Sequence, residues 1–272
     1  MLIRLVDWHP LVIAGTRGLV AAVFILAVRF LFPAPQSAPK TTFNASFWIS
    51  AFANAFVVIT FVTANRLTAS ANAVLLQYSS PIWTVLLAWV VIKERPRWEQ
   101  WGALALVFGG MFIFFREGLG AGTLLGDGVA VLSGICVATH VVFLRMSKDG
   151  NPRDILLASH IIAFVISLPF IFLHPPEMTV SSVWPILFMG VIQQGAASLF
   201  FAYGIKRVNA IQAILTSTVE PLCNPLWVFV VLGEKPSSSA FVGGALILTA
   251  VLSSSIIGAK RKQREVSPKM LR

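Results

Sequence analysis

Apolar residues fall into nine runs along the chain, each of about 20 residues and separated from the next by a short polar link. A helix of about 20 apolar residues crosses the roughly 30 Å hydrocarbon core of a bilayer. An open sheet cannot do so, because its edge amides would have no hydrogen-bond partner in lipid. The pattern therefore predicts an all-α integral membrane protein with nine helices, at about 10–32, 44–64, 70–92, 98–115, 126–147, 153–173, 182–204, 209–232 and 239–258.

The basic residues divide unequally between the two membrane faces that these helices define. Sixteen of the 21 lie on one face, four (Arg4, Arg66, Arg116 and Lys235) lie on the other, and Arg17 lies inside the first helix. Cytoplasmic loops carry the excess of lysine and arginine in membrane proteins. We therefore expect a multi-pass protein of the cell (inner or plasma) membrane, with a cytoplasmic C-terminus and the first residues outside.

Composition narrows the range of functions. The chain is 57% hydrophobic and only 12% charged, against roughly 25% charged residues in a soluble domain, so most of its surface faces lipid. The net charge of +10 does not indicate nucleic-acid binding, because the basic residues are spread over loops and one tail. Cys136 and Cys223 fall in apolar helices, where cysteine usually serves as a small buried hydrophobe. We expect no cofactor and no metal.

The chain repeats itself at an offset of 140 residues. Residues 73–96 and 213–236 align without gaps and share eight identities in 24 positions, among them Pro81 with Pro221. Five crossings separate equivalent helices, and an odd number gives the two halves opposite orientations. Inverted repeats are typical of transporters that work by alternating access, with the solute site between the repeats near the bilayer midplane.

The repeat also predicts a helix that this chain lacks. The helix at 126–147 should have a counterpart at about −14 to 7, and only its end, Met1–Asp7, is present. We expect inverted five-helix repeats, ten helices in all, of which nine are present here because a truncated gene model or product omits the first. The predicted units are 1–118, a first repeat lacking its first helix, 119–258, a second repeat, and 259–272, a basic cytoplasmic tail.

Several landmarks follow one another through the predicted helices. They are His9–Pro10, Arg17, Pro81, Glu94, Trp101–Gly102, Gly109–Gly110, Gly126–Asp127, Glu220–Pro221, Gly233–Glu234 and Gly243–Gly244. No single one is specific, but the ordered set, from about residue 8 to 258, resembles the EamA-type permeases of the drug/metabolite transporter (DMT) superfamily. The resemblance implies ten helices, two cytoplasmic termini and export of amino acids, other metabolites or drugs. The absent first helix is a departure from that pattern.

Glu220 is the one acidic residue that the pattern places at the centre of a predicted helix. A carboxylate at mid-bilayer costs about 2.5–3.5 kcal/mol on insertion scales, and such residues usually face a cavity. Glu220 could exchange a proton or bind a substrate amine there. It could equally form a hydrogen bond to a neighbouring helix near the break at Pro221, and both interpretations stay open.

Further polar and aromatic residues join Glu220 in a predicted solute cavity. Spacings of three and four residues place one group on a single face of the helix at 209–232: Gln212, Thr216, Glu220, Asn224 and Trp227. The repeat-related helix offers Gln77, Tyr78, Ser80 and Trp83. Asn54 and Gln194 lie 140 residues apart, at equivalent points of two further helices, and Gln193, Ser198 and Tyr203 lie on the same helix as Gln194. Hydrogen bonding between helices is the alternative role for these residues.

Other residues inside the helices have a structural interpretation beside a functional one. His140 is a further candidate for the cavity, whereas His160 is expected to be a packed, hydrogen-bonded group. Arg17 lies about two turns from the outer surface, close enough for its charged end to reach the interface, which favours a structural role. Gly102 and Gly109, like Gly243 and Gly244, are expected to let helices pack closely.

The sequence thus predicts a transporter with a small-molecule solute and the lipid bilayer as partners, and it leaves a homodimer open. A channel-like pore would need polar residues along the whole bundle, whereas here they cluster near mid-depth; a membrane protein that transports nothing is the other alternative. An enzyme is not expected, because the chain contains no HExxH, no GxSxG and no phosphate-binding glycine loop. The aromatic candidates suit an aromatic or apolar metabolite, or a cation.

Overall fold

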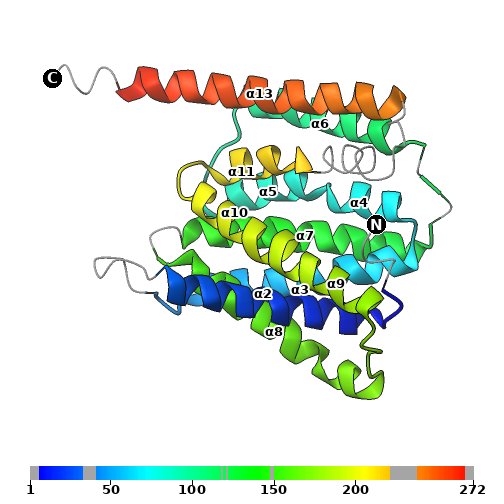
Figure 1. Ribbon diagram of the computed structural model, residues 1–272. Helices are drawn as coiled ribbons and strands as arrows, with labels where there is room; N and C mark the ends of the chain where they lie inside the picture. Colours follow the sequence, from blue (N-terminus) through cyan, green and yellow to red (C-terminus); the bar gives the residue numbers. More distant parts are fainter. Residues whose placement is uncertain are drawn as a thin grey trace.

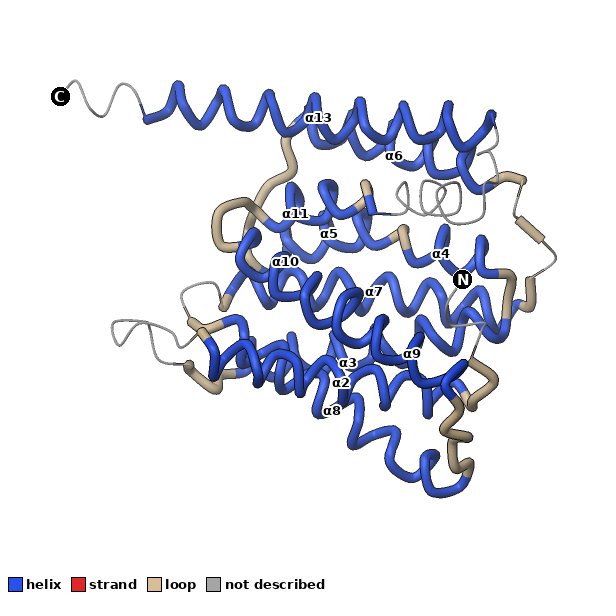
Figure 2. The backbone as a smooth tube through the Cα atoms, viewed as in Figure 1, coloured by secondary structure: helices blue, strands red, loops and turns tan. Residues whose placement is uncertain are grey.

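The computed structural model describes residues 6–32, 41–117, 119–120, 122–147, 150–220 and 238–266, with side chains of the last helix as far as residue 258. These residues form helices and loops, and no strand occurs among them (Figure 2). Within them, eight helical segments are long and apolar enough to cross a membrane. The expected all-α membrane fold is confirmed. The number of nine helices stays a prediction, because 209–232 is described only as far as Glu220.

The spans follow the predicted apolar runs to within a few residues. In chain order the elements are α2 (Pro10–Leu31), α3 (Ala45–Leu67), α4 (Ser70–Gln77), α5 (Ser80–Val91), α6 (Trp98–Phe115), α7 (Leu124–Met146), α8 (Pro152–Leu173), α9 (Val180–Phe188), the π-helix η1 (Met189–Ala196), α10 (Ala197–Ile205), α11 (Ala210–Ser217) and α13 (Ser238–Val266). Two of these spans have an internal feature that the sequence did not predict. The run at 70–92 is divided into α4 and α5, and the run at 182–204 contains η1.

Short polar side chains determine where several helices begin. The side chain of Asn44 accepts a hydrogen bond from the Phe47 amide at 2.9 Å, and Thr123 accepts one from the Gly126 amide at 3.1 Å. Asn151 caps α8 in the same way, with Pro152 in the first turn, as the sequence indicates. Each cap satisfies an amide that has no partner within its helix, which matters most where lipid offers none.

Helices at equivalent points of the predicted repeat pack against each other. α2 packs against α8, and α6 packs against α13. The α6–α13 pair forms one edge of the bundle and α8 lies at the opposite edge (Figure 1). The bounds of α4 and α11 differ by 140 residues at both ends, the offset found in the sequence. The inverted repeat itself stays a prediction.

The outer surface of the bundle is apolar. Large hydrophobic side chains such as Phe30, Trp98 and Phe200 are 77–88% exposed. A soluble monomer rarely exposes contiguous apolar surface of this kind. Together with the lengths of the spans, this surface identifies a multi-pass membrane protein whose perimeter contacts lipid tails.

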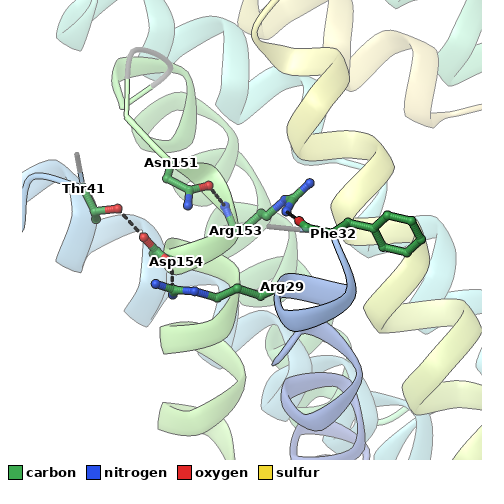
Figure 3. Close-up of polar contacts among 6 residues, drawn as sticks. All are labelled: Arg29, Phe32, Thr41, Asn151, Arg153 and Asp154. Atoms are coloured by element: carbon green, nitrogen blue, oxygen red, sulfur yellow. Dashed lines mark hydrogen bonds and ion pairs between the residues drawn. The ribbon is translucent and has the colours of Figure 1, made fainter. Parts of the chain in front are cut away.

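Polar contacts tie the helices together at the end of the bundle where α2 finishes and α8 begins (Figure 3). The Arg29 Nη1 atom lies 2.7 Å from Asp154 Oδ1, and the Thr41 hydroxyl donates to the other oxygen of the same carboxylate. Arg153 Nη1 donates to the Phe32 carbonyl at 3.0 Å. These contacts hold the start of α8 against the end of α2 and the segment before α3. We call this end of the bundle the basic end.

Candidate functional site

A cavity of about 570 Å³ lies inside the bundle, within the usual size range for small-molecule sites. Its polar lining residues are Arg17, Asn54, Gln77, Tyr78, Ser80, His140, His160, Gln193, Gln194, Ser198, Ser217 and Glu220, and its apolar ones include Val57, Phe61, Val137, Leu156 and Phe201. They come from α2, α3, α4, α5, α7, α8, η1, α10 and α11. Most lie well inside their spans, so the polar part of the cavity is near mid-depth.

The break between α4 and α5 directs three residues into this cavity. Pro81 has no amide hydrogen, so a continuous helix would leave the Gln77 carbonyl without its donor. α4 ends at Gln77 instead, and α5 begins at Ser80 with the proline in its first turn. A Cβ added at Gly134 of α7 would lie 2.7 Å from that carbonyl oxygen, so only glycine lets α7 approach the break. Gln77, Tyr78 and Ser80 consequently line the cavity.

The π-helix η1 supplies two neighbouring glutamines to the opposite wall. Wider turns of this kind are uncommon and frequently occur at functional sites. η1 packs closely on α2, because a Cβ at Gly190 would lie 2.6 Å from Val20 Cβ and one at Gly195 would lie 2.5 Å from Phe24 Cδ1. Gln193 and Gln194, which are adjacent in sequence, both line the cavity.

Arg17 lies in the cavity wall and not at the membrane surface. Its residue surface is only 4% exposed, and its Nη2 atom donates to Gln193 Oε1 at 3.2 Å. Nε and Nη1 are buried and have no hydrogen-bond partner among the described residues. The expectation that this side chain extends to the interface was wrong. α2 presents Arg17 towards η1, and the small residue Gly18 lets the α8 backbone approach beside it, with the His160 carbonyl 3.1 Å from an added Cβ.

The two histidines inside the membrane differ in their contacts. Nδ1 of His140 lies 3.0 Å from both the hydroxyl and the carbonyl oxygen of Ser50. Because a carbonyl only accepts, we assign the proton to Nδ1, which leaves Nε2 as an acceptor. His160 is 1% exposed, and neither of its ring nitrogens has a hydrogen-bond partner in the described part of the chain. The expected role of His160 as a hydrogen-bonded packing group therefore does not fit the structure.

Glu220 and three predicted polar residues form contacts along the cavity wall. The Tyr78 hydroxyl donates to Glu220 Oε2 at 3.5 Å. Gln77 Nε2 donates to the Ser133 hydroxyl and Asn54 Nδ2 donates to the Ser159 hydroxyl, each at 2.8 Å. Asn54 and Gln77 thus join α3 to α8 and α4 to α7 while they line the cavity.

Four predicted site residues lie away from the cavity. Gln212 Nε2 donates to the Ser255 hydroxyl at 2.8 Å and so ties α11 to α13, and the Thr216 hydroxyl is exposed and donates to the carbonyl of its own helix. Trp83 Nε1 donates to the Ser79 hydroxyl at 3.1 Å. Tyr203 contacts Arg153 at the basic end, with the guanidinium carbon 5.2 Å from the ring centre. Asn224 and Trp227 lie outside the described residues.

Of the predicted five-residue stripe, the three described members, Gln212, Thr216 and Glu220, do not share one helix face, because α11 ends at Ser217. Glu220 follows Ser217 after a turn, so helical spacing from Gln212 no longer predicts its direction. The polar lining of the cavity also includes Arg17, His160 and Ser217. From the sequence, Arg17 and His160 were expected to be structural, and Ser217 was not predicted to have a role. A charged residue inside an apolar span is the signal that identified Glu220 as a candidate. The same signal could have identified Arg17. No comparable signal distinguishes Ser217.

The chain is similar to known transporters. The sequence profile of the EamA-like transporter family matches residues 1–116 and 124–256. "Uncharacterized transporter YwfM" of Bacillus subtilis (strain 168) is 30% identical over 203 residues, 70% of this chain and 65% of that protein. "Uncharacterized transporter YcxC" of the same organism is 26% identical over 216 residues, 74% of this chain and 69% of that protein. This chain thus spans about two thirds of the length of these relatives.

A solved crystal structure has the same overall shape. It superimposes with a TM-score of 0.78 and covers 92% of this chain and 89% of its own. The two sequences are 16% identical, so the likeness concerns the fold alone.

Proposed function

Since the chain belongs to the EamA-like transporter family, we propose that it carries a small solute across the membrane by alternating access. One observation carries the proposal: a cavity of about 570 Å³ combines polar groups near mid-depth with apolar walls. Residues of both predicted repeats line it, Asn54 and Gln77 from the first and Gln193 and Glu220 from the second. Alternating-access carriers hold their solute at this position, between two repeats that move against each other.

Contacts at both ends of the bundle support a carrier over a channel. At the basic end, Arg29 pairs with Asp154, and Arg153 bonds to Phe32. At the opposite end, the Trp8 indole donates to the Glu177 carbonyl at 3.1 Å, and the Thr68 hydroxyl donates to Asp127 at 2.7 Å. A carrier needs two such sets of contacts, which break in turn. A channel needs a path that is open through both ends at once.

We further propose that the basic end faces the cytoplasm of a plasma-membrane protein and that transport is outward. Basic residues gather at this end, where Arg29, Arg145 and Lys206 bind partners in α8, α10 and the loops around them. Cytoplasmic loops carry that excess. The outward direction comes from the resemblance to export permeases, and amino acids, related metabolites and drugs are the candidate solutes.

A metabolite-wide screen tests this function. Cells that produce the full chain should release at least one metabolite faster than cells without it, and the purified protein in liposomes should then exchange that metabolite in counterflow. Downhill flux without exchange would indicate a channel. Chemical conversion of the solute would indicate an enzyme, and no flux of any metabolite would contradict a transport function.

A further inference from the structure

Arg17 is a buried cation without a counter-ion in the described part of the chain. Ion pairs there join Arg29 to Asp154 and Arg145 to Glu94, and both lie at the basic end. Arg17 has five N–H donors, and its described partner is one amide oxygen, Gln193 Oε1. Leaving a guanidinium buried and unpaired is costly, so such a group is normally matched by an anion.

The groups around Arg17 also lack partners. Gln194 Oε1 is buried without a hydrogen-bond donor among the described residues, and so are both ring nitrogens of His160. All of these side chains line the same cavity, from α2, α8 and η1. The orientation of the Gln194 amide is interchangeable, so this residue can present N–H donors to the cavity as well as an oxygen. One wall therefore presents several polar groups that no described protein group satisfies.

Glu220 forms no ion pair with Arg17. It is the acidic residue among those that line the cavity, and its described hydrogen bond is with Tyr78 beside the α4–α5 break. Arg17 bonds to η1 on a different wall. No acidic side chain in the described part of the chain therefore pairs with Arg17, and the open volume beside it is the solute cavity.

We propose that Arg17, with Gln193 and Gln194, binds the carboxylate of a solute whose remaining part is apolar or aromatic. This inference rests on the proposed transport function and names the solute class. One arginine balances one negative charge, which suits a monocarboxylate, whereas a doubly charged phosphate would face a single cation. A guanidinium matches the planar shape of a carboxylate with paired hydrogen bonds. Val57, Phe61, Val137 and Phe201 supply an apolar surface for the rest of the molecule.

The test compares carboxylates with their uncharged amides. The full chain is purified in detergent, and its thermal unfolding is followed with benzoate, hydrocinnamate or indole-3-acetate, and with benzamide, hydrocinnamamide or indole-3-acetamide. Ligands that bind only the folded state raise the melting temperature. At least one carboxylate should raise it in a saturable way while its amide does not. Equal shifts for every acid and its amide, or no shift for any acid, would overturn the proposal without any variant.

Substitutions then place the binding at Arg17. Arg17→Gln should weaken carboxylate binding roughly tenfold to a hundredfold, the usual loss for a charged hydrogen bond. Arg17→Lys keeps the charge but loses the planar fork, so it should bind more weakly than wild type and provides the measurement if the glutamine variant does not fold. Arg116→Gln, at an exposed site, is the matched control and should bind as wild type does. Unchanged affinity in a folded Arg17 variant would contradict the assignment.

Failure of this inference can be told apart from failure of the transport function. If the protein exchanges a solute in counterflow and that solute is neutral or cationic, transport stands and the carboxylate site does not. If carboxylates bind through Arg17 but no solute is exchanged, the binding site stands and transport does not.

Discussion

At the scale of single residues, the chemistry of the cavity depends on a few groups that lipid would not tolerate. Glu220 could be chosen from the sequence because a carboxylate inside an apolar run needs a cavity or a partner. Arg17 offers the same signal, but its position near a helix end also fitted a side chain that reaches the surface. The packing of α2 against η1 decides between these interpretations, and no local pattern predicts it.

Replacing Glu220 tests its proposed role in proton exchange or in binding a substrate amine. Glu220→Gln keeps size and most hydrogen bonding but removes the charge. Counterflow should fall roughly tenfold or more, the scale of one charged hydrogen bond, or lose its pH dependence, while folded yield stays near that of wild type.

Asp7→Asn, at an exposed position before α2, is the matched control for this substitution. Normal rates with unchanged pH dependence in Glu220→Gln would show that the carboxylate has no part in transport. Loss of folded protein would instead show that Glu220 is a structural tie.

His9 should make the stability of the protein depend on pH. Its Nδ1 accepts a hydrogen bond from the Leu11 amide at 3.3 Å, and its ring lies 5.3 Å from Phe170 and 4.7 Å from His174. Partial burial and, to a lesser extent, the neighbouring His174 lower the pKa of His9 below its ordinary 6.5. As the pH falls, His9 therefore takes up a proton in the unfolded chain before it does so in the folded chain. The contribution of neutral His9 to stability is fully present above the ordinary pKa and is lost as the pH falls below it.

The melting temperature in detergent should therefore fall between about pH 7.5 and about pH 5.5, across the ordinary range for histidine. His9→Asn keeps an acceptor for the cap but cannot titrate, so its melting temperature should fall less over the same interval. An identical fall in both proteins would show that the charge on His9 is not involved.

At the scale of elements, the apolar runs predicted where the spans lie, because length and hydropathy alone decide that. They could not predict the π-helix, because its i→i+5 hydrogen bonds leave no mark on hydropathy. They also could not predict which glycines touch another helix. Gly102 and Gly109 have no atom within 4 Å of an added Cβ, whereas Gly110 and Gly243 meet each other at the α6–α13 contact.

Two neighbouring glycines of α6 give a matched test of that contact. A Cβ at Gly110 would lie 2.9 Å from the Gly243 carbonyl oxygen and 2.8 Å from Ile247 Cγ1. Gly110→Ala should therefore lower the free energy of unfolding by about 1–3 kcal/mol, the usual cost of overpacking.

Gly109→Ala, with open space around the added carbon, should leave stability unchanged or slightly higher. Thermal melting in detergent measures both variants. Equal destabilisation by the two substitutions would contradict the close α6–α13 contact.

At the scale of the whole molecule, the distribution of basic residues and the internal repeat predict a topology. The contacts in the structure can be compared with that topology. The basic residues that the sequence assigns to one face, such as Arg29, Arg153 and Lys206, do lie at one end of the bundle. A fluorescent reporter that matures only in the cytoplasm, fused after residue 272, should give signal. A dark fusion, with an external-only reporter active at the same site, would reverse the orientation.

The central claim is that one cavity opens to each side of the membrane in turn, and cysteine labelling tests it most directly. Ser198 lines the cavity, while Thr42 and Ser181 are exposed at the two ends of the bundle. Each is changed to cysteine in a chain that carries Cys136→Ala and Cys223→Ala. A membrane-impermeant thiol reagent is then added to right-side-out and to inverted vesicles.

Thr42→Cys and Ser181→Cys should each react in one vesicle orientation and mark the two sides. Ser198→Cys should react in both vesicle orientations. In each orientation, the reagent should not reach the marker, Thr42→Cys or Ser181→Cys, that faces the vesicle interior. Reaction of Ser198→Cys from one side only would contradict alternating access through this cavity, and passage of the reagent to the interior would indicate an open channel.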